Sequence, residues 1–243
     1  MGEESLPAFL IGRYEVTWKE WRTVSAWAAE NGYDLGDAGD GCADDHPVHS
    51  VTWFDVIKWC NARSEMEALV PVYRLQGDVF RGGTETPEWN TEANGYRLPG
   101  EAEWEFAARG GLQGRDTAYS GSDIIDEAGW FWDNAMEAPC DLSAGRGTWP
   151  VGRKKANELG LHDMSGNVWE WCWDEYGKFR RIRGGSWDPA YGSMAACKVS
   201  FRDYAHPTYK RYSIGFRLAR DADENPDRSA DLHDNGYSIQ SDY

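Results

Sequence analysis

The sequence lacks three features that would each point to a particular class of protein. It has no apolar run near the roughly 18 residues that a membrane-spanning helix needs. Its five cysteines are scattered without the C-x-x-C spacing of zinc sites, so mostly reduced, buried thiols are expected. Basic residues are scarce, since 25 Lys and Arg stand against 41 Asp and Glu and give a net charge of −16. We therefore expect neither a transmembrane segment nor a nucleic-acid partner.

The N-terminus also lacks a secretory signal. Residues 1–5 carry neither a basic start nor an apolar stretch. They are equally compatible with a chain that is exported or surface-anchored and whose leader has been removed. The sequence therefore leaves the compartment open.

Tryptophan and glycine are abundant, with 14 and 27 copies in 243 residues. This composition favours broad layers of packed aromatic side chains joined by tight turns. A strand is expected over residues 9–16. Helices are expected after Thr17, where a capping box begins, and near Thr52. A third helix is expected over residues 101–109, with its glutamates in water. From Gly110 onward helical periodicity is rare, which indicates short strands and long ordered loops.

A series of short motifs runs in a fixed order along nearly the whole chain. They are Tyr14–Thr17, His46–Val48, Tyr96–Glu105, Pro150–Gly152, Gly160–Trp171, Arg183–Trp187 and Ile214–Arg217. In this order they resemble the formylglycine-generating enzyme and sulfatase-modifying-factor family. The resemblance implies an α+β, C-type-lectin-like fold of the formylglycine-generating-enzyme type, with few helices. It implies one lectin-like domain over residues 1–220, and the Asp-, Asn- and Ser-rich residues 221–243 are expected to form an acidic, mobile tail.

The catalytic cysteines of that family are missing. Its enzymes oxidise a substrate cysteine with a copper-bound cysteine pair that follows the Gly-Gly-Ser motif. Aligning this motif here places the pair at Pro189 and Met194, and neither side chain supplies a thiolate. Cys197 lies nearby but is alone. We therefore expect no catalytic residue and no enzyme activity; the alternative is an oxidoreductase-type family enzyme, or an accessory domain of one, with a non-standard site.

One metal site of the family can be carried over residue by residue. The resemblance places a structural calcium ion on carboxylate and backbone oxygens of four residues: Asp163, Gly166, Val168 and Glu170. Such a set of oxygens suits a hard cation. The alternative is a turn in which the two carboxylates only make hydrogen bonds, to the backbone and to Arg217. The sequence leaves both open, and no other cofactor is expected.

Residues 188–213 lie between two family motifs and have the composition of a binding surface. Tyr and Phe give large rigid contacts, and Ser, Gly, Asp and Thr give adaptable polar ones. Trp187, Met194, Lys198 and Lys210 cannot be reached by replacing the adenines of an asparagine codon. The expected ligand-binding residues all can, and they are Asp188, Tyr191, Gly192, Ser193, Phe201, Asp203, Tyr204, Ala205, His206, Thr208, Tyr209, Tyr212 and Ser213.

This layout resembles the variable proteins of diversity-generating retroelements, some of which use this fold. The sequence therefore predicts a non-catalytic ligand-binding protein that presents a diversified C-terminal surface, about residues 188–213, on a rigid scaffold. The expected partner is a protein or another macromolecule of a cell surface. The alternative is an ordinary loop whose tyrosines pack into the core. Exposed aromatic side chains in this segment would separate the two.

Overall fold

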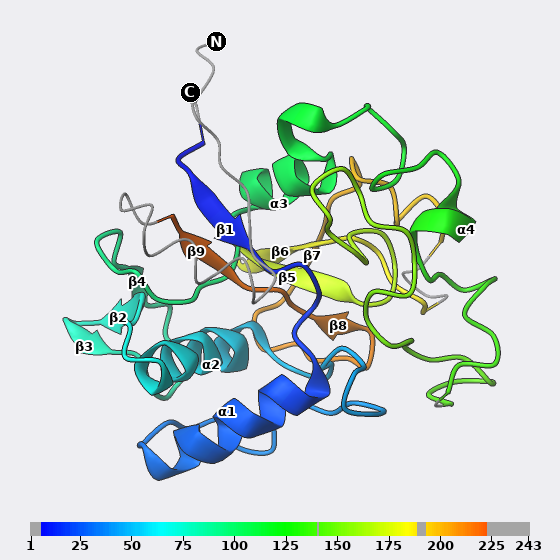
Figure 1. Ribbon diagram of the computed structural model, residues 1–243. Coiled ribbons are helices and arrows are strands. Elements are labelled where there is room, and N and C mark those ends of the chain that lie inside the picture. The colour runs from blue at the N-terminus through cyan, green and yellow to red at the C-terminus, as the bar shows by residue number, and fades with distance from the viewer. Residues whose placement is uncertain (1–5, 140, 189–192, 223–243) are drawn as a thin grey trace.

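The computed structural model describes residues 6–139, 141–188 and 193–222 and has the expected α+β architecture (Figure 1). Long ordered loops connect four α-helices and one short 3₁₀ helix within these residues. The helices are α1 (Trp18–Glu30), α2 (Trp53–Met66), α3 (Glu101–Ala108), η1 (Gly111–Gln113) and α4 (Ile125–Ala128). The strands are β1 (Phe9–Ile11), β2 (Tyr73–Leu75), β3 (Asp78–Val79), β4 (Glu88–Trp89), β5 (Trp169–Tyr176), β6 (Phe179–Arg183), β7 (Asp203–Ala205), β8 (Ile214–Gly215) and β9 (Ala219–Asp221).

These strands form three small sheets. The first and last strands, β1 and β9, pair antiparallel and bring the two ends of the described chain together (Figure 1). A second sheet has the order β3-β2-β4. The third has the order β7-β6-β5-β8, in which β8 runs parallel to β5. This third sheet carries the segment expected to bind a ligand.

The expected starts of α1 and α2 are confirmed, because each of these two helices has a complete capping box. The Thr17 hydroxyl accepts from the backbone N–H of Glu20 at 3.3 Å, and the Glu20 carboxylate accepts from the Thr17 N–H at 2.9 Å. Thr52 and Asp55 make the same reciprocal pair at the start of α2. Two amide donors that the first turn leaves free are thereby satisfied at each helix start.

The strand expected over residues 9–16 is shorter than predicted. Only Phe9–Ile11 form a ladder, with β9. Beyond it, the N–H of Gly12 donates to the Leu218 carbonyl at 2.8 Å and the N–H of Val16 to the Phe216 carbonyl at 2.9 Å. The chain thus stays beside the C-terminal segment through isolated bonds and does not continue the strand.

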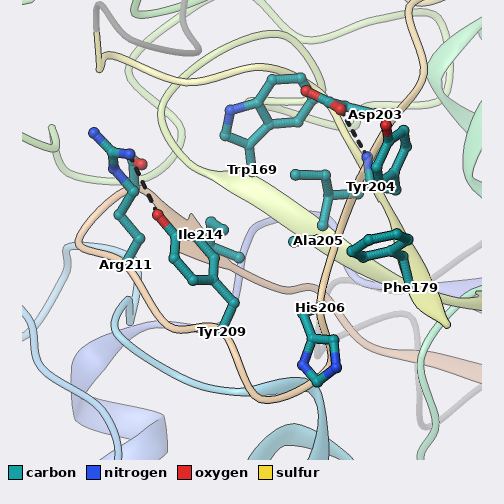
Figure 2. A pocket seen from close by; sticks show the side chains of 11 residues that line it. Trp169, Phe179, Asp203, Tyr204, Ala205, His206, Tyr209, Arg211 and Ile214 are labelled. Atoms are coloured by element: carbon teal, nitrogen blue, oxygen red, sulfur yellow. Dashed lines mark hydrogen bonds between the residues drawn. The ribbon is translucent and has the colours of Figure 1, made fainter.

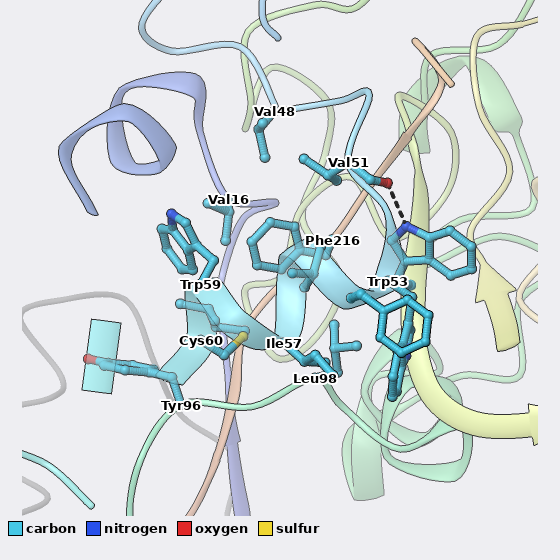
Figure 3. Close-up of a cluster of buried hydrophobic side chains, with 14 of the residues drawn as sticks. Val16, Val48, Val51, Trp53, Ile57, Trp59, Cys60, Tyr96, Leu98 and Phe216 are labelled. Carbon is cyan, nitrogen blue, oxygen red and sulfur yellow. Dashed lines mark hydrogen bonds between the residues drawn. The ribbon is translucent and has the colours of Figure 1, made fainter. Parts of the chain in front are cut away.

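Tryptophans join the helices to the C-terminal motif in the largest core cluster (Figure 3). Trp21 of α1 stacks on Trp59 of α2 with ring centroids 5.6 Å apart and planes 1° from parallel. Phe216 meets both rings edge-on, at 5.9 and 5.4 Å. The three rings are buried, so the C-terminal motif is part of the core that holds the two helices.

The expectation that the α3 glutamates face water is wrong. Glu101 and Glu105 each accept a hydrogen bond of 2.9 Å from the guanidinium of Arg183, which is fully buried. Glu103 is buried against Arg97. Burial of these carboxylates is tolerated because each has a cationic partner. Periodicity within α3 alone could not reveal those partners.

The C-terminal boundary also differs slightly from the expected one. Asp221, the first residue of the predicted tail, ends β9 opposite Phe9 and accepts a hydrogen bond from Nε of Arg97 at 2.9 Å. Residues 223–243 lie outside the described residues. No helix in the described part of the chain combines the length and the apolar composition needed to cross a bilayer.

The cysteines agree with the expectation of mostly reduced thiols. Cys60, Cys172 and Cys197 are free and buried. Cys42, in contrast, takes part in a disulfide.

Candidate functional site

The segment expected to bind a ligand is anchored in the core at both ends, as predicted. Residues 184–187 are buried before it, and residues 213–220 are buried after it. Ile214 pairs with Trp169 in the parallel contact between β8 and β5. Fixed ends of this kind allow the intervening residues to change without disturbing the core.

The middle of the segment presents aromatic side chains to solvent. Phe201, Tyr204 and Tyr209 are 38%, 44% and 41% exposed, which is unusual for large apolar side chains. Ser193, His206 and Thr208 are also exposed, while Asp203, Ala205 and Tyr212 are half-buried. The alternative of an ordinary loop with core tyrosines is therefore wrong for Tyr204 and Tyr209, whereas Tyr212 stacks on the buried Trp187 ring at 5.3 Å.

Not all of residues 188–213 belong to the exposed surface. Asp188 and Ser213, both expected there, are buried, with 1% and 0% exposure. The Ser213 hydroxyl donates to Oδ2 of Asp188 at 3.2 Å, and Arg211 makes an ion pair with the same oxygen at 2.7 Å. This pairing lets a carboxylate be buried at the base of the loop.

Two other parts of the segment fall outside the expected surface. Ala196, Cys197 and Val199 return to the core between the exposed stretches. Tyr191 and Gly192 lie outside the described residues. The described surface is therefore concentrated in residues 201–212.

A cavity of about 200 Å³ opens at this surface (Figure 2). Trp169, Ile182 and Ile214 from three neighbouring strands line it together with Phe179. Loop residues complete the lining: Asp203, Tyr204, Ala205, His206, Tyr209, Arg211 and Ser213. The structure thus gathers six of the thirteen expected binding residues around one cavity.

Aromatic rings continue from the cavity across the sheet. Tyr204 lies 4.9 Å from Phe179 and 4.9 Å from Tyr176, measured between ring centroids. Phe179 also meets the His206 ring edge-on at 6.2 Å. We call the following residues the aromatic face: Tyr176, Phe179, Phe201, Tyr204, His206 and Tyr209.

Sequence reasoning missed part of this site. Trp169 stands in a family motif and alternates with Trp171 along β5, but nothing in the alternation shows that it lines a cavity. Phe179 follows Gly177 in the β5–β6 hairpin, and only the pairing of β6 with β7 brings it beside Tyr204. Arg211 also lines the cavity, and its side chain forms an ion pair with Asp188, which is distant in the sequence.

The candidate calcium residues do not all offer free oxygens. Both carboxylate oxygens of Glu170 accept from the fully buried Arg217 at 2.6 Å, and Trp104 donates to one of them. Oδ2 of Asp163 accepts from the N–H of Gly152 at 2.7 Å, whereas Oδ1 is buried without a partner. Glu170 thus matches the hydrogen-bonded alternative, and Asp163 retains one carboxylate oxygen without a partner. The described residues contain no group of three or more His, Cys, Asp or Glu that could hold a metal ion.

A third buried carboxylate lies close to this pair. Glu15 accepts from Nδ2 of Asn167 at 2.6 Å and from the N–H of Val168 at 3.0 Å. Burial raises the pKa of Glu15 well above its ordinary range, and the charge of Asp163 raises it further. Burial also raises the pKa of Asp163.

The position of Cys197 is unsuited to thiolate chemistry. Its Sγ lies 2.7 Å from where a Cβ would stand on Gly185, whose φ of +76° and close approach both require glycine. Burial raises the pKa of the Cys197 thiol to about 12, so it stays protonated near neutral pH. Met194 is half exposed and Pro189 lies outside the described residues.

Comparison with solved structures supports the fold. The structure resembles "Crystal Structure of CarF" with a TM-score of 0.76 and 33% identity, covering 88% of this chain and 87% of that chain. It resembles Treponema denticola variable protein 1 with a TM-score of 0.70 and 30% identity, covering 88% and 84%.

Sequence relatives include proteins with different named roles. Chaperone protein LppX of Paenibacillus barcinonensis is 40% identical over 81% of this chain and 74% of its own length. The "Inactive C-alpha-formylglycine-generating enzyme 2" of Bos taurus is 36% identical over 54% of this chain, which spans only 46% of that protein. The family model of the sulfatase-modifying factor enzyme 1-like domain matches residues 1–222. The chain therefore belongs to the sulfatase-modifying-factor (formylglycine-generating-enzyme-like) family.

Proposed function

We propose that this protein is a non-catalytic binding protein that holds a polypeptide partner against the aromatic face. The observation that carries the proposal is the cavity of about 200 Å³ within a group of exposed rings on an anchored loop. Exposed aromatic side chains on a rigid backbone lose little conformational entropy on binding, and they dominate the energy of many interfaces.

One structural relative supports this proposal. A structure at 30% identity belongs to a protein named as variable, and its fold covers most of this chain. We propose that residues 201–212 are likewise the part of this chain that differs between copies. The buried Asp188 and Ser213 would then stay constant because they hold the loop.

A selection experiment tests the binding function without a known partner. A random peptide library displayed on phage should yield enriched sequences on the wild-type protein. Replacing Tyr204 and Tyr209 together by Ser should abolish the enrichment, because both rings line the cavity. Tyr14→Ser is the matched control, since Tyr14 is 38% exposed and lies outside the aromatic face. Equal enrichment by wild type and the double variant would contradict the proposal.

A second candidate function is that of a chaperone, favoured by 40% identity to a protein named as one. The aromatic face would then bind unfolded chains and not one defined partner. Wild type should reduce the light scattering of heat-unfolded citrate synthase, and the Tyr204/Tyr209 double variant should not. Absence of any effect by wild type would rule out this second function for that client.

A further inference from the structure

We propose that the cavity accepts one aromatic or large aliphatic side chain from an acidic polypeptide segment. This inference rests on the proposed binding function and names the chemistry of the ligand. Three observations carry it. They are the size of the cavity, the nearby lysines that lack an ion-pair partner, and the edge strand β7, which offers few free backbone groups to a partner strand.

The cavity has the size and lining for a single apolar anchor. An apolar cavity of about 150 Å³ holds one benzene-sized group, so about 200 Å³ suffices for one aromatic side chain. Trp169, Ile182 and Ile214 line it, and Phe179, Tyr204 and Tyr209 complete the apolar lining (Figure 2). Filling such a pocket from a partner is the usual form of an interface hot spot.

Cationic side chains lie at and beside the cavity although the whole chain is acidic. The segment from Lys198 to Arg211 has four Lys and Arg and one Asp, against 25 and 41 in the full sequence. Nζ of Lys178 lies 5.5 Å from the centre of the Phe179 ring, beside the cavity. Arg211 lines the cavity itself, and Lys210 is its exposed neighbour.

Some of these cations are already neutralised and others are not. Arg211 pairs with Asp188, and Arg202 pairs with Glu105. Arg181, stacked on the Tyr176 ring at 4.2 Å, pairs with Glu101. Lys178, Lys198 and Lys210 make no ion pair with any described residue, and Lys178 and Lys210 are sequence neighbours of the cavity-lining residues Phe179 and Arg211. Asp203 is the acidic group in the cavity lining, and its carboxylate accepts from the backbone N–H of Tyr204 at 2.8 Å. The two lysines therefore remain available to carboxylates of a ligand, which they would also attract from a distance.

The edge of the sheet disfavours binding by strand addition. β7 has three residues, and the N–H of Tyr204 is occupied by the Asp203 side chain. A short edge strand with a capped amide offers few backbone bonds to an incoming strand. The side chain in the cavity and the flanking charges must therefore supply the recognition.

Three short peptides, each labelled with fluorescein, test the inference by fluorescence anisotropy. The first places phenylalanine between pairs of glutamates, the second replaces phenylalanine by alanine, and the third replaces the glutamates by lysines. We expect the first to bind at least about tenfold more tightly than either of the others, and more weakly as salt rises.

Reversing the charge of Lys178 and Lys210 tests the same inference from the side of the protein. Lys178→Glu with Lys210→Glu should weaken binding of the glutamate peptide about tenfold and shift the preference toward the lysine peptide. Lys19→Glu, at an exposed position of α1, should change neither affinity. Thermal melts of the variants check that they are folded.

The outcomes separate this inference from the proposed function. Equal binding of the alanine peptide, or equal or tighter binding of the lysine peptide, would overturn the inference. The binding function would still stand if phage selection depended on Tyr204 and Tyr209. Loss of that dependence would overturn both.

Discussion

Two aspartates show how a single residue acquires its role from its neighbours. Asp188 and Asp203 belong to the same segment and were both expected at the binding surface. Asp188 is buried because Ser213 and Arg211 satisfy its carboxylate. Asp203 lines the cavity, and its carboxylate accepts a hydrogen bond from the backbone N–H of Tyr204. The same side chain thus anchors the loop in one place and shapes the site in the other.

Asp163 is the residue at which the calcium question can be tested. Its Oδ1 is buried without a partner, so a bound calcium ion would satisfy it and stabilise the folded state. We expect calcium to raise the melting temperature of wild type over that in chelator. The increase should disappear in Asp163→Asn, which suits the φ of +59° but carries no charge.

Asp133→Asn is the control for this prediction, because Asp133 is exposed. It should respond to calcium as wild type does. A wild-type melting temperature that is the same in calcium and in chelator would leave the hydrogen-bonded turn as the explanation for this cluster.

At the level of elements, the loop between β7 and β8 is tied to the core by its backbone. The N–H of Ser50 donates to the Arg211 carbonyl at 2.9 Å, and the N–H of Trp53 donates to the Pro207 carbonyl at 3.0 Å. The Arg211 side chain adds the ion pair with Asp188. The loop therefore keeps its course while its side chains face solvent, as a surface that tolerates sequence change requires.

The anchor and the surface should respond differently to substitution. Asp188→Ala should lower the free energy of unfolding by about 2 kcal/mol or more, because it removes the buried carboxylate that Arg211 and Ser213 share. Tyr209→Ser should change it by only about 0.5 kcal/mol, as at other surface sites. Urea unfolding measures both. Large destabilisation by Tyr209→Ser with none by Asp188→Ala would mean that the assignment of anchor and surface is reversed.

At the level of the whole molecule, the family fold is kept, whereas the positions that the resemblance assigns to the catalytic cysteines hold other residues. The aligned cysteine positions hold Pro189 and Met194. The remaining nearby thiol, Cys197, packs beneath Gly185 and is held protonated by burial. One relative in this family is itself named inactive.

We therefore expect no formylglycine formation by this protein. A peptide with the pattern Cys-x-Pro-x-Arg, incubated with the protein, copper and oxygen, should show no aldehyde by mass spectrometry. An active formylglycine-generating enzyme serves as the positive control. Aldehyde formation that disappears in Cys197→Ser would contradict the expectation and favour an enzyme with a non-standard site.

Several features of this molecule could be predicted from the sequence because their causes are local. The starts of α1 and α2 follow from Thr17 and Thr52, whose capping partners stand three residues later. The anchored ends of residues 188–213 follow from the runs of core residues on either side. The family motifs extend this local information to the whole fold, since their order is that of a known architecture.

Other features were decided only by contacts between distant parts of the chain. The α3 glutamates can be buried because they form ion pairs with Arg97 and Arg183. The Glu170 carboxylate likewise forms its ion pair with Arg217, far along the chain. The cavity exists because pairing of β5, β6, β7 and β8 brings together Trp169, Phe179 and Tyr204. Burial and charge depend on which groups meet in space, and sequence periodicity records only which side of its own element each residue occupies.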